Sequence, residues 1–171
     1  MLQWNCDKNY TFTDTHIYFW GSVFSQWHKC KFTDKSLGLT FSSAEQYMMW
    51  YKAFTFNDLD IAGKILNEKD PKEQKSLGRL VRGYDDSIWS QKRLDIVGTG
   101  NYLKFSQSES LKKELLDTGD KVLVEGSPYD RIWGVGLTFD DERIIDESNW
   151  RGENLLGKAL MVARDRIRSP L

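Results

Sequence analysis

The sequence contains few of the residues that build metal sites, disulfide frameworks or rigid loops. Its 171 residues include two cysteines, two histidines and three prolines. Cys6, Cys30, His16 and His28 are too few and too widely spaced for a Cys/His zinc site. We therefore expect no bound metal and a reducing compartment.

Long apolar runs and an excess of charge of either sign are also missing. No apolar run approaches the roughly 18 residues of a membrane span, and residues 1–10 lack the basic, apolar and small-residue succession of a signal peptide. These absences predict a cytoplasmic protein without membrane contact. The 24 basic and 25 acidic residues give a formal net charge of -1. Strong sequence-independent binding to DNA is therefore not expected, and a nucleotide-like ligand would need a local group of basic side chains.

The motifs of common nucleotide-dependent enzymes do not occur. Neither GxxxxGK[ST] nor GxGxxG is present, and there is no nucleophile elbow. Kinase, P-loop and Rossmann chemistry are thereby set aside, and we expect no cofactor. Carboxylates, lysines and aromatic rings remain as candidates. With seven Trp, seven Tyr and nine Phe, the chain has more rings than a core of this size needs, so we expect some of them to line a ligand site. The alternative, that the rings pack the interior, explains most of them.

Apolar periodicity predicts a single α+β domain over residues 1–171, predominantly helical with a small β-sheet. A chain of this length can bury roughly 70% of its unfolded surface, which is enough for one core. The first expected helix begins at Ser43. Five more are expected over residues 59–67, 71–81, 85–104, 110–117 and 156–167. The expected strands cover 17–20, 39–41, 121–125 and 132–137.

Glu45 and Lys52 form the first candidate pair. They are seven residues apart on one predicted helix, which returns both side chains to the same face about 10 Å apart. Both could reach one cleft. The alternative is structural: Glu45 follows Ser42 by three residues, as in a capping box, and Lys52 could be a solvated helix lysine.

A second candidate group follows the predicted strand 121–125. Glu125 ends that strand, Asp130 lies in the next turn, and Trp133 comes three residues later. Carboxylates delivered to a loop above a rigid strand are typical of catalytic acids and bases. Alternatively, Asp130 pairs with Arg131 or caps the turn, and Trp133 belongs to the core.

Two basic residues lie beside flexible or aromatic neighbours. Arg79 follows Gly78, and Lys104 precedes Phe105. Either residue could bind a phosphate, although each, taken singly, could equally be a surface charge.

Eight segments in order resemble the NADAR or YbiA-like family. They are FSQW at 24–27, AEQYMMWYKA at 44–53, GRLV at 78–81, Trp89 with Arg93, KF at 104–105, TG at 118–119 followed by LVE at 123–125, Asp130 with WGVG at 133–136, and GENLLG at 152–157 with LM at 160–161 and Arg164. The motif-bearing part is about 17–168. Gln26 and Trp27 stand where the family usually has Asn and Phe, and Gln46 replaces a common His. These departures bear on substrate identity more than on reaction type.

The resemblance implies a YbiA-like fold and a cofactor-independent N-glycosidase, a hydrolase of the bond between ribose C1 and a nitrogen. The substrate classes of the family are early phosphoribosylamino-pyrimidine intermediates of riboflavin biosynthesis and ADP-ribose attached to guanine. The expected partner is therefore a nucleotide-like small molecule or an ADP-ribosylated nucleobase in DNA. The alternative is a module that binds ADP-ribose or NAD without turnover.

Carried over to this chain, the resemblance assigns roles to individual residues. Glu45 and Asp130 are the leading catalytic carboxylates, with Glu125 next, and Lys52 is the candidate amine or phosphate contact. The expected binding residues are Trp89 and Trp133 on base or ribose, Arg79 and Lys104 on phosphate, and also Phe24, Trp20 and Asn154.

Overall fold

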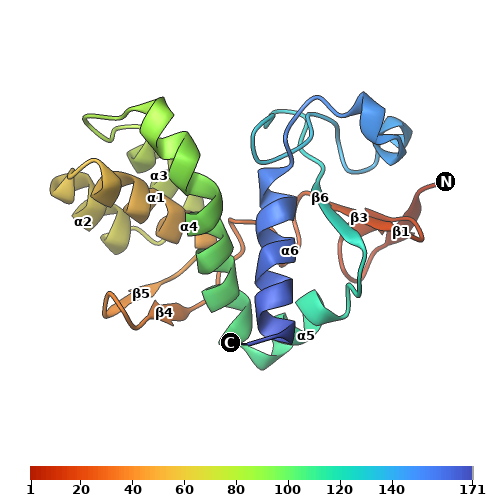
Figure 1. The fold of residues 1–171 in the computed structure, drawn as a ribbon, viewed down its shortest axis with the longest axis horizontal. Coiled ribbons are helices and arrows are strands. Elements are labelled where there is room, and N and C mark those ends of the chain that lie inside the picture. Colours follow the sequence, from red (N-terminus) through yellow and green to blue (C-terminus); the bar gives the residue numbers. More distant parts are fainter. Residues whose placement is uncertain (171) are drawn as a thin grey trace.

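The computed structural model describes residues 1–170 as six α-helices, six short strands and two 3-10 helices in one α+β domain (Figure 1). The predicted fold class is confirmed. The strands are β1 (Gln3–Asn5), β2 (Tyr10–Phe12), β3 (His16–Phe19), β4 (Phe32–Asp34), β5 (Leu39–Phe41) and β6 (Val122–Glu125). The helices are α1 (Ala44–Thr55), α2 (Leu59–Asn67), α3 (Pro71–Gly78), α4 (Asp86–Ser106), α5 (Glu109–Leu116) and α6 (Leu155–Arg168), with η1 (Glu142–Ile145) and η2 (Glu147–Asn149) before α6.

Helix α1 is the centre of the helical half, where it packs against α2, α3 and α4. The Ser43 hydroxyl accepts a hydrogen bond from Gln46 N at 3.0 Å, which caps its first turn. Gln46 also links helices: its Nε2 donates to the carbonyl oxygens of Ile65, Leu66 and Glu68 at the end of α2. The amide at this position therefore satisfies carbonyls that the end of α2 leaves unpaired.

The main sheet has the order β1-β2-β3-β6, with β3 and β6 parallel and the other pairs antiparallel. The residues of β3 alternate between two cores. Ile17 and Phe19 pack with the helices, whereas Tyr18 packs with Val124 and the apolar residues of the segment before α6. The sheet therefore supports the helices on one face and that segment on the other. Strands β4 and β5 form a separate hairpin.

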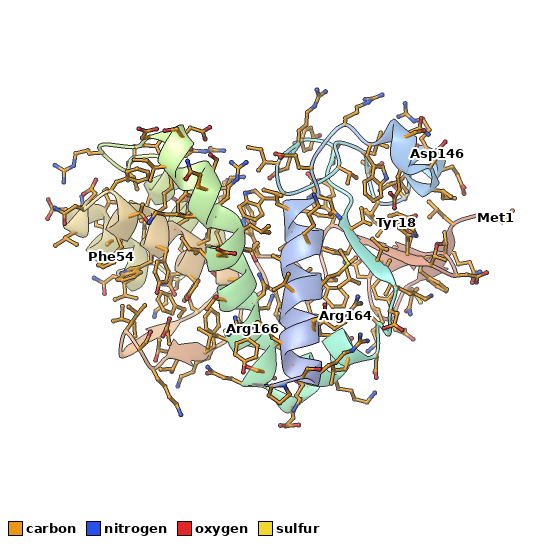
Figure 2. The ribbon with its side chains drawn as sticks, in the orientation of Figure 1. Met1, Tyr18, Phe54, Asp146, Arg164 and Arg166 are labelled. Carbon is orange, nitrogen blue, oxygen red and sulfur yellow. The ribbon has the colours of Figure 1, made fainter. Side chains whose placement is uncertain are left out.

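Helices α4 and α6 run side by side between the helical half and the main sheet (Figure 1). The arginines near the end of α6 point in different directions (Figure 2). The Arg166 guanidinium lies 4.1 Å from the ring centre of Tyr102 on α4, whereas Arg164 Nη1 donates to Thr118 Oγ1 and Lys121 O beside β6. These side chains therefore join α6 to both neighbours, rather than only complementing the negative end of the helix.

The predicted strand over 132–137 is wrong. The structure has bends and no regular element there. The carbonyl oxygens of Ile132 and Trp133 accept hydrogen bonds from the N–H groups that open α6, at 3.1 and 3.2 Å. The backbone groups that a sheet would use are thus engaged by a helix. Val135 and Leu137 are nevertheless buried, which explains why the apolar pattern is strand-like.

The other differences concern boundaries and short elements. Helix α3 ends at Gly78 rather than at Val81, and Trp20 lies outside β3. The sequence reading did not assign β1, β2 or β4 individually. Within residues 1–170, no helix combines the length and apolar character needed to cross a bilayer.

Candidate active site

A cleft lies between the helical half and the loop that joins β6 to α6. It consists of two adjoining cavities with volumes of about 420 and 200 Å³. The residues that line both cavities, here called the middle of the cleft, are Met48 on α1, Lys75 and Arg79 on and after α3, and Asp130 and Trp133 in the loop. Segments separated by 50 to 80 residues in sequence therefore meet at one place.

The two ends of the cleft differ in character. The larger cavity, here called the aromatic end, is lined by Trp20, Gln26, Trp27, Glu125 and Tyr129 in addition to the middle. The ring centres of Trp20 and Tyr129 are 6.2 Å apart, and both side chains are exposed.

The smaller cavity, here called the cationic end, carries basic side chains. In addition to the middle, the charged and aromatic residues that line it are Glu45, Lys52, Tyr84, Asp86, Trp89 and Arg93. A nucleotide-like ligand needs these two environments, since a heterocycle stacks on rings and a phosphate pairs with cations.

Glu45 enters the cationic end from the first turn of α1. The cap of that helix is made by Ser43 with Gln46, so the carboxylate of Glu45 is not used in a capping box. Glu45 is 3% exposed. Burial, with a smaller contribution from the charge of Asp130, raises the pKa of Glu45 to about 7 against the opposing charges of Lys75, Lys52 and Arg79. At neutral pH this carboxyl group can therefore both hold and release a proton.

Glu125 is delivered to the aromatic end by the last position of β6. Burial, followed by the charges of Asp130 and Glu45, raises the pKa of Glu125 to about 8, although Lys75 opposes the shift. Its Oε2 is buried without a hydrogen-bond partner among residues 1–170. A carboxyl group that keeps its proton at neutral pH is suited to act as a general acid.

Asp130 is both a turn residue and a cleft residue. Its Oδ1 accepts hydrogen bonds from Ile132 N at 2.9 Å and Trp133 N at 2.7 Å. The turn-capping alternative is thus realised, and the same carboxylate also lines the middle of the cleft. Its charge acts on both Glu45 and Glu125, so the three acids form one electrostatic group.

Lys52 reaches the cationic end from the last turn of α1. Its Nζ lies 4.6 Å from the ring centre of Tyr84. Burial lowers the pKa of Lys52, and Arg79 lowers it further, while Glu45 opposes the shift. A lysine with a lowered pKa has more of the neutral amine that acts as a nucleophile. Among residues 1–170, no three His, Cys, Asp or Glu side chains are arranged to bind a metal ion.

Comparison with known proteins identifies the family. The model of the NADAR domain matches residues 18–168. The chain belongs to the NADAR family.

Curated relatives of this NADAR chain include two N-glycosidases. One, from Acanthamoeba polyphaga mimivirus, is 44% identical over 90% of this chain and 96% of its own length. The other, from Nostoc punctiforme, is 32% identical over 76% of each chain. A riboflavin biosynthesis protein of Vibrio vulnificus is 29% identical over 76% of this chain and 32% of its own length.

The fold of this NADAR chain is also found in a solved structure. The NMR structure of the E. coli protein YbiA has a TM-score of 0.72, with 24% identity, over 94% of this chain and 89% of that protein. At this identity the likeness concerns the fold, which is the YbiA-like fold that the sequence predicted.

The NADAR cleft brings together eight of the eleven predicted site residues. They are Glu45, Asp130, Lys52, Glu125, Trp89, Trp133, Arg79 and Trp20. The structure places the other three elsewhere. Phe24 is buried in the core, with its ring centre 5.5 Å from that of Phe19 and 6.1 Å from that of Phe105.

Lys104 and Asn154 support cleft residues from behind. Lys104 is 1% exposed, and its Nζ donates to Val23 O at 2.7 Å and Ser25 O at 3.0 Å, which holds the loop that carries Gln26. Asn154 Oδ1 accepts a hydrogen bond from Glu125 N at 3.0 Å. A direct phosphate contact for Lys104 has no support in this geometry.

Lys75, Arg93 and Gln26 were not predicted as site residues of the NADAR cleft. Lys75 precedes Arg79 by four residues on the same predicted helix, so the i, i+4 spacing could have indicated it. Arg93 follows Trp89 by four residues on α4, and the two were named together as one of the family segments without a role for the arginine. Gln26 gave no such signal because its position in the cleft depends on long-range contacts.

Proposed function

We propose that this enzyme hydrolyses the bond between ribose C1 and a nitrogen in a phosphate-bearing, nucleotide-like substrate. The chain is a hydrolase acting on N-glycosyl compounds, as its identity to the viral and cyanobacterial N-glycosidases indicates. The proposal concerns the substrate and the residues that act on it. One observation carries it: three acids from distant segments share one cleft with aromatic side chains at one end and basic side chains at the other.

The raised pKa values of Glu45 and Glu125 suit the proton transfers of N-glycoside cleavage. As the bond from C1 to nitrogen breaks, positive charge develops on the ribose ring. Asp130, in the middle of the cleft, stabilises that charge, and the protonated Glu125 transfers its proton to the leaving nitrogen. Ionised Glu45 accepts a proton from the water whose oxygen bonds to C1. The products are a free base and a ribose with a C1 hydroxyl.

The ends of the cleft orient the substrate. Trp20, Trp27 and Tyr129 provide stacking surfaces for the base, and Trp133 contacts the ribose in the middle. Arg79, Lys75 and Arg93 receive the phosphate. Two substrate classes fit this arrangement: phosphoribosylamino-pyrimidines, which the names of several relatives support, and ADP-ribose attached to guanine.

Lys52 offers a second route to the same products. If the ribose ring opens, the neutral amine can attack C1, form an imine with loss of the base, and be released by water. The lowered pKa of Lys52 and its place in the cationic end support this route. Borohydride added during turnover would reduce such an imine to a stable amine. Mass spectrometry would then find the sugar on the peptide containing Lys52 and would find none with Lys52→Met.

The direct test measures product release. The protein is incubated with an oligonucleotide carrying ADP-ribosyl guanine and with phosphoribosylamino-pyrimidines, and released base is quantified by mass spectrometry. Glu45→Gln and Asp130→Asn are each expected to lower kcat by about 10²- to 10⁴-fold. Glu109→Gln, at an exposed position of α5, is the matched control. If both cleft variants fold and release base at the wild-type rate, the proposed roles are wrong.

A further inference from the structure

Gln26 is a buried polar residue of the cleft with one unused hydrogen-bond donor. It is 7% exposed and lines the aromatic end. Its Oε1 accepts a hydrogen bond from Asn101 Nδ2 at 2.9 Å. Its Nε2 has no hydrogen-bond partner among residues 1–170. A buried donor without a partner is costly, so a ligand atom that accepts a hydrogen bond from this amide gains affinity.

The orientation of the Gln26 amide is fixed by its neighbour. Asn101 Nδ2 also donates to Val97 O at 2.9 Å, one turn earlier on α4. Turning the Asn101 amide over would place its oxygen against the Val97 carbonyl oxygen, which is repulsive. Asn101 therefore presents N–H to Gln26, and Gln26 must present its oxygen in return. The Nε2 group is left as the free end.

The place of Gln26 decides which part of a substrate it meets. Gln26 lines the same cavity as Trp20, Trp27 and Tyr129, whereas Lys52 and Arg93 line the other. The aromatic side chains favour a flat heterocycle at this end. The Gln26 backbone is also fixed there, since its carbonyl oxygen accepts a hydrogen bond from Glu45 N at 3.0 Å.

We propose that Gln26 determines specificity for the leaving base by donating a hydrogen bond from Nε2 to a carbonyl oxygen of that base. The proposal rests on the N-glycosidase function above and narrows its substrate class to oxo-bearing heterocycles. A base without that carbonyl leaves the donor buried and unpaired, so it is rejected.

The experiment compares two substrates that differ at one oxygen. For the guanine class, the pair is ADP-ribosyl guanine and ADP-ribosyl 2-aminopurine in the same oligonucleotide, since 2-aminopurine keeps the 2-amino group and lacks the 6-carbonyl oxygen together with the N1 proton of the lactam. For the pyrimidine class, the pair is a phosphoribosylamino-pyrimidinone and its analogue with hydrogen in place of the carbonyl oxygen. Wild-type kcat/KM is expected to be on the order of 10- to 100-fold higher for the oxo substrate.

Gln26→Met tests the donor itself. Methionine has nearly the same length and leaves no unpaired donor, so the variant should cleave both members of the pair at similar rates. Gln91→Met on the exposed face of α4 is the matched control and should keep the wild-type ratio.

Three results overturn the proposal. If wild-type protein has the same kcat/KM for the oxo substrate and for its analogue, the enzyme does not recognise the carbonyl oxygen. This comparison needs no variant. If folded Gln26→Met protein shows the same fold decrease in kcat/KM on both substrates, the substitution has removed only the contact with Asn101. Wild-type protein that cleaves neither the guanine nor the pyrimidine substrate contradicts the N-glycosidase function on these classes, and the inference falls with it.

Discussion

The Asn154 side chain holds the backbone of Glu125 in place. Asn154 Oδ1 accepts a hydrogen bond from Glu125 N at 3.0 Å, and Nδ2 donates to Leu123 O at 2.9 Å. Asn154 is the residue before the first turn of α6, with φ +54°, yet its side chain makes no capping bond to that helix. The amide is used on β6 instead, so Asn154 positions the strand that carries Glu125.

Removing this amide should loosen Glu125 without disturbing the local backbone. Asn154→Gly is compatible with a positive φ and deletes both hydrogen bonds. We expect the free energy of unfolding to fall by about 2 kcal/mol, since two buried backbone groups lose partners. The rate of base release should fall by roughly tenfold, because Glu125 is less well oriented.

A second asparagine provides the control for backbone effects. Asn57 also has a positive φ, +57°, and is exposed. Asn57→Gly should change stability and rate little. Chemical denaturation and product release, measured for both variants, distinguish the loss of the Asn154 amide from the effect of a glycine. Equal losses in the two proteins would mean that the cost arises from glycine and not from the lost amide.

The activity should follow a bell-shaped pH profile. Burial raises the pKa of Glu45 to about 7 and that of Glu125 to about 8, and the proposed mechanism needs Glu45 ionised and Glu125 protonated. We therefore expect kcat/KM to rise up to about pH 7 and to fall above about pH 8. Glu125→Gln should lose the alkaline limb, and Glu45→Gln the acidic limb. A profile that is flat from pH 6 to 9 would contradict both assignments.

The same two acids should make the protein less stable as the pH rises. Both have folded-state pKa values above the ordinary value, so the folded protein binds more protons than the unfolded chain between about pH 4.5 and 8. Their stabilising contribution is complete below pH 4.5 and is lost as pH passes through 7 and 8. Glu45 alone accounts for on the order of 3 kcal/mol.

Glu45→Gln isolates this contribution to stability. The glutamine does not titrate, so the variant should lose less stability between pH 5 and pH 8 than the wild type. Urea denaturation at several pH values measures the slope. Glu109→Gln, on the exposed start of α5, should keep the wild-type slope. An identical slope for Glu45→Gln and wild type would show that Glu45 is not buried with a raised pKa.

The sequence predicted best the elements whose signals are local. Helices α2, α3 and α4 each begin after an aspartate, at Asp58, Asp70 and Asp85, whose side chain accepts a hydrogen bond from a backbone N–H two or three residues later. Such caps and the apolar periodicity that follows them are visible within one short segment of sequence. The structure of residues 132–137 could not be predicted from local signals. Its carbonyls bind the start of α6, about 20 residues further along the chain.

In the candidate site, too, local patterns predicted some residues, whereas the roles of others depend on distant segments. Glu45 and Lys52 were found from helical spacing, and Glu125 and Asp130 from their place after a strand. The roles of Lys104 and Asn154 were not readable, because each side chain bonds to backbone of a segment 29 or more residues away. A charged or amide side chain looks the same in sequence whether it contacts a ligand or supports a neighbouring loop.

Close contact between α6 and β6 gives the last prediction. A Cβ atom at Gly157, in the first turn of α6, would lie 1.9 Å from the carbonyl oxygen of Leu123, which is rigid backbone. Gly157→Ala must therefore push α6 away from β6 and should cost about 3 kcal/mol or more of stability. At Gly98, within α4, the nearest atom is Val162 Cγ1 at 3.8 Å, an ordinary contact. Gly98→Ala should instead stabilise by about 0.5 to 1 kcal/mol, because alanine favours the helix. Thermal and urea denaturation of the two variants should shift in opposite directions, and a shared direction would contradict the packing between α6 and β6.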